Sequence, residues 1–396
     1  MNKQNSLPNE FCPDGIEFKT IDELIKRKVI KIISPSIKIK KNDFLNFGTI
    51  PIISQEQEYI SGYTNVSDNK ILEDEYVCFG DHSEHIKYVN FKFVQGADGL
   101  KILAIEQKEQ ILPKYLYYSV SNYYVKYNNY ERHFKYFRQI EIPVPPLPVQ
   151  EEIVRILDNF TELTAELKAE LTARKKQYEY YQNLVFKIGN SNAFFLEDIA
   201  MVKARIGWQG LTKKEYLPNG FALLVTGIDF KNGKIDFKNC HYVTKDRYEQ
   251  DKNIQLMEND ILVTKDGTLG KMAYVKDLPQ NATLNSGVFV IRVKEKDKVL
   301  PRYLYHYLNS GKLMNYAKSK LTGGTIKHLN QNVVVKTPVI LPSLQEQQRI
   351  VDILDRFDKL CNDITEGLPA EIEARQKQYE YYRNKLLTFK PLEEVK

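Results

Sequence analysis

The chain has 396 residues, a length that suggests two or three domains rather than one compact core. Hydrophobic residues make up 42% and charged residues 27%, which excludes wholesale disorder and a fibrous repeat. The 57 basic and 51 acidic residues leave a net charge of +6, so overall charge says little about a nucleic-acid partner.

The amino-terminal segment is polar, and no uncharged apolar stretch of the sequence is long enough to span a bilayer. Export and membrane insertion are therefore not expected. The 4 cysteines lie far apart and form no CxxC pair, so they define neither a zinc knuckle nor a dense disulfide framework. We expect a protein of the reducing cytoplasm.

Two variable regions show the alternating pattern of half-buried strands, punctuated by Asn, Gly and Pro clusters. The predicted strands are Val29–Ser34, Tyr76–Phe79, Phe221–Val225, Ile261–Thr264 and Gly287–Val293. Helices are predicted at Tyr115–Tyr124 and Tyr303–Met314. Each variable region therefore reads as a mixed α/β domain of about 140 residues.

Part of the first variable region mixes aromatic with basic side chains. Between Asn122 and Arg138, tyrosines and phenylalanines alternate with Lys126, Arg132 and Lys135. Aromatic rings stack on bases and cations neutralise phosphates, so this mixture suits nucleic acid. The alternative is that the rings are core and the cations a solvated rim.

A helical block follows each variable region and is nearly identical in its two copies. The pattern that starts Pro145-x-Leu147-x-x-Gln150 and continues IVxILDxF recurs without a gap from Pro342. Further on, KQYEYY occurs in both copies. Such self-similarity predicts a tandem duplication, with residues 1–144 and 190–341 as the variable units and 145–189 and 342–396 as the helical units.

Apolar residues recur at steps of three or four from Ile153 to Val185 and from Ile350 to Leu386, as in a coiled-coil seam. The two helices are expected to bury these stripes on each other. Gly367 and Pro369 interrupt the second stripe, and proline removes a backbone donor and clashes with the preceding turn. A kink or short break is predicted there.

The second variable region contains a long run without acidic residues. No Asp or Glu occurs from Lys298 to Gln345, although 51 of the 396 residues are acidic. Seven cations occupy the run: Lys298, Arg302, Lys312, Lys318, Lys320, Lys327 and Lys336. Because a basic stretch occurs in both repeats, we favour nucleic acid over the solvated-rim interpretation.

Recognisable catalytic chemistry is missing from the sequence. The only Pro-Pro pair, Pro145-Pro146, lacks the Asp/Asn-Pro-Pro-Tyr/Phe context that holds a flipped adenine for methylation. The Gly-Lys pairs lack the upstream glycine and following Ser/Thr of a phosphate-binding loop. Cys78, Asp81, His82 and His85 are possible zinc ligands, but such loop histidines are more often surface groups.

At the paired helical blocks the chain resembles the specificity (S) subunit of type I restriction-modification systems. The residues that carry this resemblance are PPLPVQEEIVRILDNF with ARKKQYEYYQN, and LPSLQEQQRIVDILDRF with ARQKQYEYYRN. The segments Ile50–Thr64 and Gly80–Tyr88 also resemble target recognition domains of this family. Because recognition domains vary widely, no base preference transfers.

The resemblance implies a non-catalytic subunit that binds double-stranded DNA, with two mixed α/β target recognition domains held apart by two antiparallel helices. Two modification (methyltransferase) subunits and restriction (endonuclease and translocase) subunits are the implied partners. S-adenosylmethionine, ATP and Mg²⁺ would belong to those partners, with no cofactor in this chain. The alternative is a duplicated coiled-coil scaffold whose domains bind nucleic acid without reading sequence.

Candidate DNA contacts follow from the basic and aromatic loops of both units, and no catalytic or metal-binding residue is assigned. The candidates are His82, His85, Arg132, His133, Lys135 and Arg138 in the first unit, and Arg205, Trp208, Lys265, Lys271, Thr322, Thr325, Lys327 and His328 in the second. Base contacts would specify sequence, and phosphate contacts would only position the protein.

Overall fold

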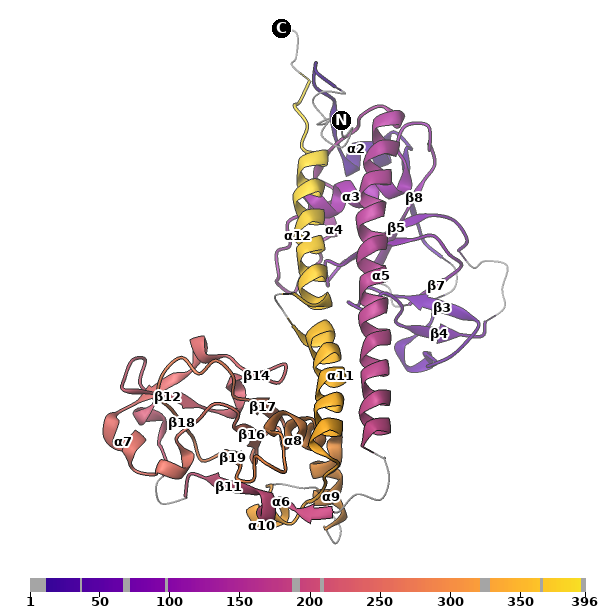
Figure 1. Cartoon of the computed structure of the whole chain (residues 1–396). Helices are drawn as coiled ribbons and strands as arrows, with labels where there is room; N and C mark the ends of the chain where they lie inside the picture. The colour runs from indigo at the N-terminus through magenta and orange to yellow at the C-terminus, as the bar shows by residue number, and fades with distance from the viewer. Residues whose placement is uncertain are drawn as a thin grey trace, which may run out of the picture. The chain divides into compact units, whose positions relative to one another are not determined.

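The computed structural model describes residues 12–35, 38–66, 72–96, 99–186, 193–206, 210–320, 328–363 and 366–392. The chain divides into two compact units. Unit 1 contains residues 1–165 and 374–396, and unit 2 contains residues 166–373. The boundary falls inside the longest helix, α5 (Leu147–Val185), which therefore contributes its first half to unit 1 and its second half to unit 2 (Figure 1).

Unit 1 contains a four-stranded antiparallel sheet in the order β2-β8-β5-β6, a three-stranded sheet in the order β4-β3-β7 and the ribbon β1-β9. The strands predicted around Val29 and Tyr76 are confirmed as β2 and β5. The strands are β1 (Phe18–Thr20), β2 (Ile30–Ile33), β3 (Ile50–Ile53), β4 (Gly62–Thr64), β5 (Tyr76–Gly80), β6 (Ile86–Val89), β7 (Val94–Gln95), β8 (Leu100–Ile105) and β9 (Glu141–Pro143).

Unit 2 repeats this arrangement with the sheets β11-β19-β16-β17 and β15-β12-β18 and the ribbon β10-β20, and it adds the hairpin β13-β14. The three strands predicted in the second variable region are confirmed as β12, β16 and β19. The strands are β10 (Ala193–Phe195), β11 (Ala200–Ala204), β12 (Ala222–Val225), β13 (Phe230–Lys231), β14 (Lys234–Ile235), β15 (His241–Val243), β16 (Ile261–Thr264), β17 (Met272–Tyr274), β18 (Ala282–Leu284), β19 (Val288–Val293) and β20 (Pro338–Ile340).

The two units share their strand pairing as well as their strand order. In each three-stranded sheet the central strand has one antiparallel and one parallel neighbour, β4 and β7 beside β3, and β15 and β18 beside β12. In each four-stranded sheet a hairpin, β5–β6 or β16–β17, lies at one edge. A residue of one unit therefore has a structural counterpart in the other.

Short helices connect the sheets. The predicted helices near Tyr115 and Tyr303 are confirmed, each beginning at a proline, where the missing amide hydrogen costs nothing. The second is interrupted by a π-helical turn, Leu308–Lys312, in which Gly311 has φ +88°. The helices are α2 (Ile21–Lys26), α3 (Pro113–Tyr123), α4 (Phe134–Phe137), α6 (Leu196–Ile199), α7 (Lys245–Glu249), α8 (Pro301–Tyr307), α9 (Leu313–Ser319) and α10 (Gln331–Val335), with 3₁₀ turns at Lys41–Asp43, Lys213–Glu215, Gly227–Asp229, Phe237–Asn239 and Lys252–Ile254.

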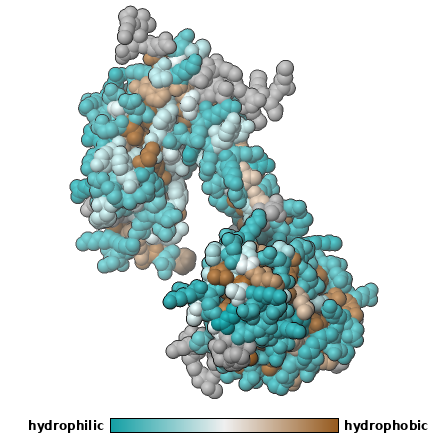
Figure 2. All heavy atoms as spheres, turned by 90° about the vertical axis from the view of Figure 1, so that its left-hand side faces the viewer, coloured by the Kyte–Doolittle hydropathy of each residue, from teal (hydrophilic) through white to brown (hydrophobic). Residues whose placement is uncertain are grey.

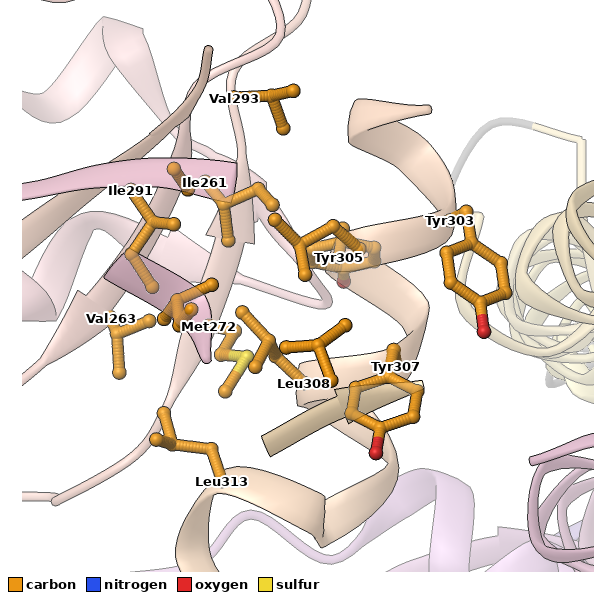
Figure 3. Packing of buried hydrophobic residues seen from close by; sticks show 14 of the residues in the cluster. Ile261, Val263, Met272, Ile291, Val293, Tyr303, Tyr305, Tyr307, Leu308 and Leu313 are labelled. Atoms are coloured by element: carbon orange, nitrogen blue, oxygen red, sulfur yellow. The ribbon is translucent and has the colours of Figure 1, made fainter. Parts of the chain in front are cut away.

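Each unit buries one connecting helix, α3 in unit 1 and α8 in unit 2, against its four-stranded sheet. In unit 2 the side chains of Ile261 and Ile291 point from the sheet towards Tyr305 of α8 and Leu308 of the π-helical turn that follows it (Figure 3). In unit 1, α3 supplies Tyr115 and Leu116 to the corresponding cluster. Burying such large apolar side chains, each worth about 1.5–3 kcal/mol, is the main force that fixes the helix on the sheet.

One buried tyrosine and one buried glutamine tie each unit to the start of a long helix. The hydroxyl of Tyr115 donates to the carbonyl of Pro143 over 3.0 Å, and that of Tyr303 donates to Ile340 over 2.7 Å. Gln150 and Gln347, both fully buried, occupy the first turns of α5 and α11 (Leu344–Asn362). The duplicated sequence thus builds duplicated buried contacts.

The second helical block is broken, as predicted. Helix α11 ends at Asn362, and α12 (Leu368–Leu387) begins after five intervening residues, with Pro369 in its first turn. A side chain at Gly367 would lie 2.6 Å from the carbonyl oxygens of Lys359 and Asp363, so only glycine fits this approach without a shift. The break therefore has both a proline and a glycine cause.

The long helices pair as an antiparallel coiled coil. In unit 1, the ring of Phe160 on α5 stacks on Tyr382 of α12 at 5.2 Å between ring centroids. In unit 2, Tyr178 on α5 stacks on Phe357 of α11 at 5.9 Å. Each unit therefore packs a phenylalanine of one repeat against a tyrosine of the other, which confirms the predicted use of the apolar stripes.

The visible face of each unit is mostly hydrophilic, with scattered apolar residues (Figure 2). Within the part of the chain that the structure describes, no helix is both long and apolar enough to cross a bilayer.

Candidate nucleic-acid interface

In unit 1 the β5–β6 hairpin meets the loop that precedes α4. The backbone amide of His133 donates to the carbonyl of Asp81 over 2.7 Å, and the amide of Phe134 donates to the Asp81 carboxylate over 3.0 Å. The Nδ1 atom of His82 lies 3.0 Å from the carbonyl oxygen of Glu131. Two segments separated by about fifty residues therefore form one surface, the unit 1 loop pair, which we define as residues 81–85 and 124–135.

Glu84 fixes the unit 1 loop pair from inside. Its side chain is buried, and its carboxylate accepts hydrogen bonds from the Tyr124 hydroxyl at 2.6 Å and from the amides of Tyr127 and Asn128, both at 2.8 Å. Burial raises the pKa of Glu84, but these three donors outweigh burial and hold its pKa below the usual value. A charged carboxylate with three donors makes this loop rigid.

Aromatic and basic side chains cover the outside of the unit 1 loop pair. Tyr130 is 90% exposed and stacks on His82, with ring centroids 5.3 Å apart. Lys135 lies 4.5 Å above the ring of Tyr136. Arg132 is exposed and makes no hydrogen bond or ion pair with any residue in the described ranges. Exposed rings beside an unpaired guanidinium are suited to contacts with bases and phosphates.

Unit 2 repeats the loop pair with different side chains. The amide of Leu329 donates to the carbonyl of Lys265 over 2.9 Å, the counterpart of the His133–Asp81 bond. His328 Nδ1 lies 2.5 Å from the carboxylate of Asp266, which occupies the place of His82. We define the unit 2 loop pair as residues 265–271 with 328–329.

The unit 2 hairpin is held by the last residue of β16. Thr264 is buried, its hydroxyl accepts from the amide of Lys271 over 2.9 Å, and it donates to the carbonyl of Thr268. Lys265 lies 3.7 Å from Asp266, an exposed pair of little energetic weight. The hairpin therefore carries cations on a fixed backbone.

The structure buries two of the proposed contact residues and pairs a third with an acidic side chain. His133 is fully buried beneath the unit 1 loop pair, and Arg205 is only 2% exposed. Arg205 donates to the carbonyl of Leu284 over 2.8 Å and to the hydroxyl of Thr283 over 3.2 Å. Arg138 forms an ion pair with Asp22 on α2. Burial argues against DNA contacts by His133 and Arg205, whereas Arg138 is partly exposed and is paired much as Lys135 is paired with Glu131.

The remaining candidates divide by position. The structure brings His82, His85, Arg132 and Lys135 together in unit 1, where Lys126 Nζ lies 3.4 Å from His85 Nδ1. It brings Lys265, Lys271 and His328 together in unit 2. The other proposed residues lie outside the described residues: Trp208, Thr322, Thr325 and Lys327.

Several cations of the acid-free run, Lys298 to Gln345, are paired in the folded protein with carboxylates from outside the run. Arg302 is paired with Asp355 at 2.7 Å and with Asp358 at 2.8 Å, both from α11. Lys298 and Lys336 also have carboxylate partners from outside the run. The run therefore supplies a weaker positive field than its composition indicates.

The zinc interpretation finds no support in the geometry. Cys78 is fully buried in the core cluster of β5, and burial raises the pKa of its thiol to about 12, which disfavours the thiolate that binds zinc. Within the described ranges, no group of three His, Cys, Asp or Glu side chains could hold a metal ion.

Sequence reasoning did not find two residues that shape the unit 1 loop pair. Gln55 accepts a hydrogen bond from the amide of His82 at 3.2 Å through its side chain and one from the Ser83 hydroxyl through its carbonyl. The sequence did not point to Glu84, because an acidic residue is not expected to organise a basic surface. Its place between two histidines was the only signal in the sequence.

Comparison with known proteins adds the family. The family described as Type I restriction modification DNA specificity domain matches residues 13–174 and again residues 189–374. The chain is 32% identical over 398 residues to the specificity subunit of the Escherichia coli type I restriction enzyme EcoR124I/EcoR124II, covering 96% of this chain and 97% of that protein.

Two solved structures share the fold. The S subunit of a type I restriction-modification system from M. genitalium aligns with a TM-score of 0.59 at 14% identity, over 98% of both chains. A chain from a structure of type I restriction-modification complex assembly aligns with a TM-score of 0.55 at 14% identity, over 94% of this chain and 97% of the other. With two family matches that follow the two repeats and a relative similar over nearly its whole length, the chain belongs to the type I restriction-modification DNA specificity family.

Proposed function

We propose that this chain reads a two-part DNA target, one half with each unit, and neither methylates nor cleaves DNA by itself. Residues 1–144 and 190–341 act as the two readers, and residues 145–189 and 342–396 hold them at a fixed separation. The observation that carries this proposal is the loop pair, which is built twice on the same sheets with different side chains.

The differences between the loop pairs argue against a scaffold that binds nucleic acid without reading it. His82 and Asp266 occupy equivalent places but have different partners: His82 faces the backbone carbonyl of Glu131, and the Asp266 carboxylate faces the ring of His328, the counterpart of Arg132. A surface that only neutralises phosphates needs cations in both places, whereas a carboxylate repels phosphate and accepts hydrogen bonds from base edges. Variation in donors and acceptors on a constant frame is the pattern expected of two readers with different targets.

The duplicated helices support docking of two copies of one partner. Tyr180 on α5 and Tyr381 on α12 hold equivalent places in KQYEYY, and both are more than half exposed. Each packs edge to face on the tyrosine that follows it. Exposed, preorganised tyrosines are typical interface anchors. We assign the two docking partners as modification (methyltransferase) subunits, to which restriction subunits add.

Catalytic cofactors are assigned to the partners. S-adenosylmethionine would bind the modification subunits, and ATP and Mg²⁺ the restriction subunits. The supporting observation is the sequence of this chain, which contains neither the methylation motif nor a phosphate-binding loop.

Exchange of one unit tests the proposal. Residues 1–144 are replaced with the same region of another family member, and methylated adenines are mapped in cells that also produce the modification subunits. One half of the methylated motif should change and the other half should stay. A reciprocal exchange of residues 190–341 is the matched control and should change the opposite half. Loss or change of both halves in either chimaera that still assembles would contradict independent reading.

A further inference from the structure

We propose that Ile228 determines specificity in unit 2 by contacting the C5-methyl group of a thymine in the second half-site. This inference rests on the proposed function and names one reader within it. Ile228 is 78% exposed, although isoleucine is among the residues most often buried.

A rigid turn presents Ile228 to solvent. The turn Gly227–Asp229 follows β12, and the carboxylate of Asp229 accepts from both the amide and the hydroxyl of Thr226, each at 2.8 Å. Asp229 and Thr226 are both 6% exposed, so this clamp is shielded from water. The side chain between them is held outward on a fixed backbone, which lowers the entropic cost of a contact.

The turn lies next to the unit 2 loop pair. A Cβ atom at Gly227 would lie 2.7 Å from the Thr264 side chain, so the turn packs directly on the end of β16. The hairpin that carries Lys265 and Lys271 begins at the next residue. Ile228 therefore sits at the same end of unit 2 as the residues proposed to meet DNA.

The duplication provides an internal comparison for this position. Strand β3 of unit 1 holds the place of β12, and Glu56 is the third residue after β3 as Ile228 is the third after β12. Glu56 is paired with Lys41. Ser54 and Thr226, which begin the two turns, are both buried. The preceding strand is shared, whereas the side chain at the third position after it changes from a paired carboxylate to an exposed hydrocarbon, as expected of a position that sets the target.

Chemistry selects the ligand. Lysines on the hairpin can neutralise phosphates, but such contacts carry no sequence information. In the major groove the only apolar group on a base edge is the thymine C5-methyl group, and an aliphatic side chain recognises it by excluding water. Isolated apolar side chains are common on protein surfaces, yet this one lies on a shielded turn beside the loop pair.

The test removes the apolar group first from the DNA and then from the protein. The second half-site is first read from the methylation map. The complex with modification subunits is then titrated with duplexes in which each thymine of that half-site is replaced singly by deoxyuridine, which lacks only the methyl group. For the unmodified protein, one position should weaken binding about fourfold, the factor expected when one methyl group loses its apolar contact. The Ile228→Ala complex should bind the two duplexes equally at that position.

Met257→Ala is the matched control, because Met257 is 52% exposed and precedes β16 at the end of the strand opposite Thr264. This variant should keep the fourfold preference. The inference is overturned if no thymine position responds, if the half-site has no thymine, or if Ile228→Ala keeps the preference. A complex that binds its mapped target no better than scrambled DNA would overturn the proposed function as well, so the two failures are distinguishable.

Discussion

At the scale of the residue, buried charges shape the candidate interface from beneath. Glu84 gathers three donors, and Lys87, which is 5% exposed, donates to the carbonyls of Ser54 at 2.9 Å and Glu58 at 2.5 Å. Burial lowers the pKa of Lys87. Both side chains hold loops rather than meet solvent. Charged groups in these recognition units therefore fall into two classes, those that face outward and those that fix the loops.

Replacing Glu84 by glutamine should destabilise unit 1. The amide group of glutamine brings a donor towards the amides of Tyr127 and Asn128, so at least one of these donors loses its acceptor. We expect a loss of about 1–3 kcal/mol in the free energy of unfolding. Urea denaturation at neutral pH measures it. Glu109→Gln is the control, since Glu109 is exposed and unpaired within the described ranges, and it should change stability by less than about 0.5 kcal/mol.

The Glu84 contribution should depend on pH in a defined direction. Its folded-state pKa lies below the usual value of 4.5, so the folded protein binds the proton less readily than the unfolded chain. The stabilisation is present above 4.5 and is lost as the pH falls through the lower, folded-state pKa. The stability difference between the unmodified protein and Glu84→Gln should therefore shrink on acidification below 4.5. A difference that grew on acidification would contradict this account.

At the scale of the element, each connecting helix is attached to a long helix by the same contacts. On α5, Asp158 accepts from Lys114 at 2.7 Å and from the Tyr118 hydroxyl at 2.6 Å. On α11, Asp355 accepts from Arg302 at 2.7 Å and lies 2.6 Å from His306. Within each unit, two side chains one helical turn apart thus grip one carboxylate. The recognition unit and its half of the coiled coil should unfold together.

The buried glutamines give a sharper test of this attachment. Gln150 accepts from the amide of Leu112 and donates to the carbonyls of Gln110 and Pro145, and all three distances lie between 2.7 and 2.9 Å. Gln347 makes the same three bonds, to Leu300, Lys298 and Pro342. Among the described residues, no other side chain makes hydrogen bonds to these backbone groups.

Gln150→Leu should therefore lower the stability of unit 1, and Gln347→Leu that of unit 2, by about 3 kcal/mol each, because buried backbone groups lose their partners. Hydrogen exchange measured by mass spectrometry would locate the loss. Gln345→Leu, an exposed position on α11, is the matched control and should leave both units unchanged. A loss spread equally over both units after a single substitution would show that the attachments are not independent.

At the scale of the whole molecule, helix α5 is continuous over 39 residues and passes through both units. It contains three consecutive tetrapeptides that end in Glu-Leu, from Phe160 to Leu171. An amphipathic helix alone explains leucines at this spacing. A helix that joins two readers also sets the distance between the DNA segments they read, so its length has a measurable consequence.

Inserting one extra Thr-Ala-Glu-Leu after Leu167 should lengthen the unread spacer of the DNA target by one or two base pairs. Four helical residues add about 6 Å and about 40° of rotation, and B-DNA rises about 3.4 Å per base pair. Both half-site sequences should stay the same. Mapping methylated adenines gives the answer. The same tetrapeptide inserted after Asp277, in an exposed turn of unit 2, is the control and should leave the spacer unchanged. An active α5 variant with an unchanged spacer would remove the ruler role.

The sequence by itself determined the architecture of this protein. Period-two and period-three-to-four patterns located strands such as β5 and β16 and the long helices, because side-chain direction in regular structure follows from local geometry. The break near Pro369 could also be predicted from the sequence, because proline disrupts the helix that contains it. The duplication could be predicted because a repeat is read directly from the amino-acid sequence.

Only the tertiary structure decided which side chains meet solvent. Arg205 and His133 are residue types that commonly contact DNA, yet both are buried. Arg302 is neutralised by Asp355, which follows it by 53 residues. Ile228 had the composition of core and is exposed. Charge and hydropathy are properties of a residue, but burial and pairing depend on segments brought together by the fold. Chain-local patterns therefore predicted the frame, and long-range packing selected the surface.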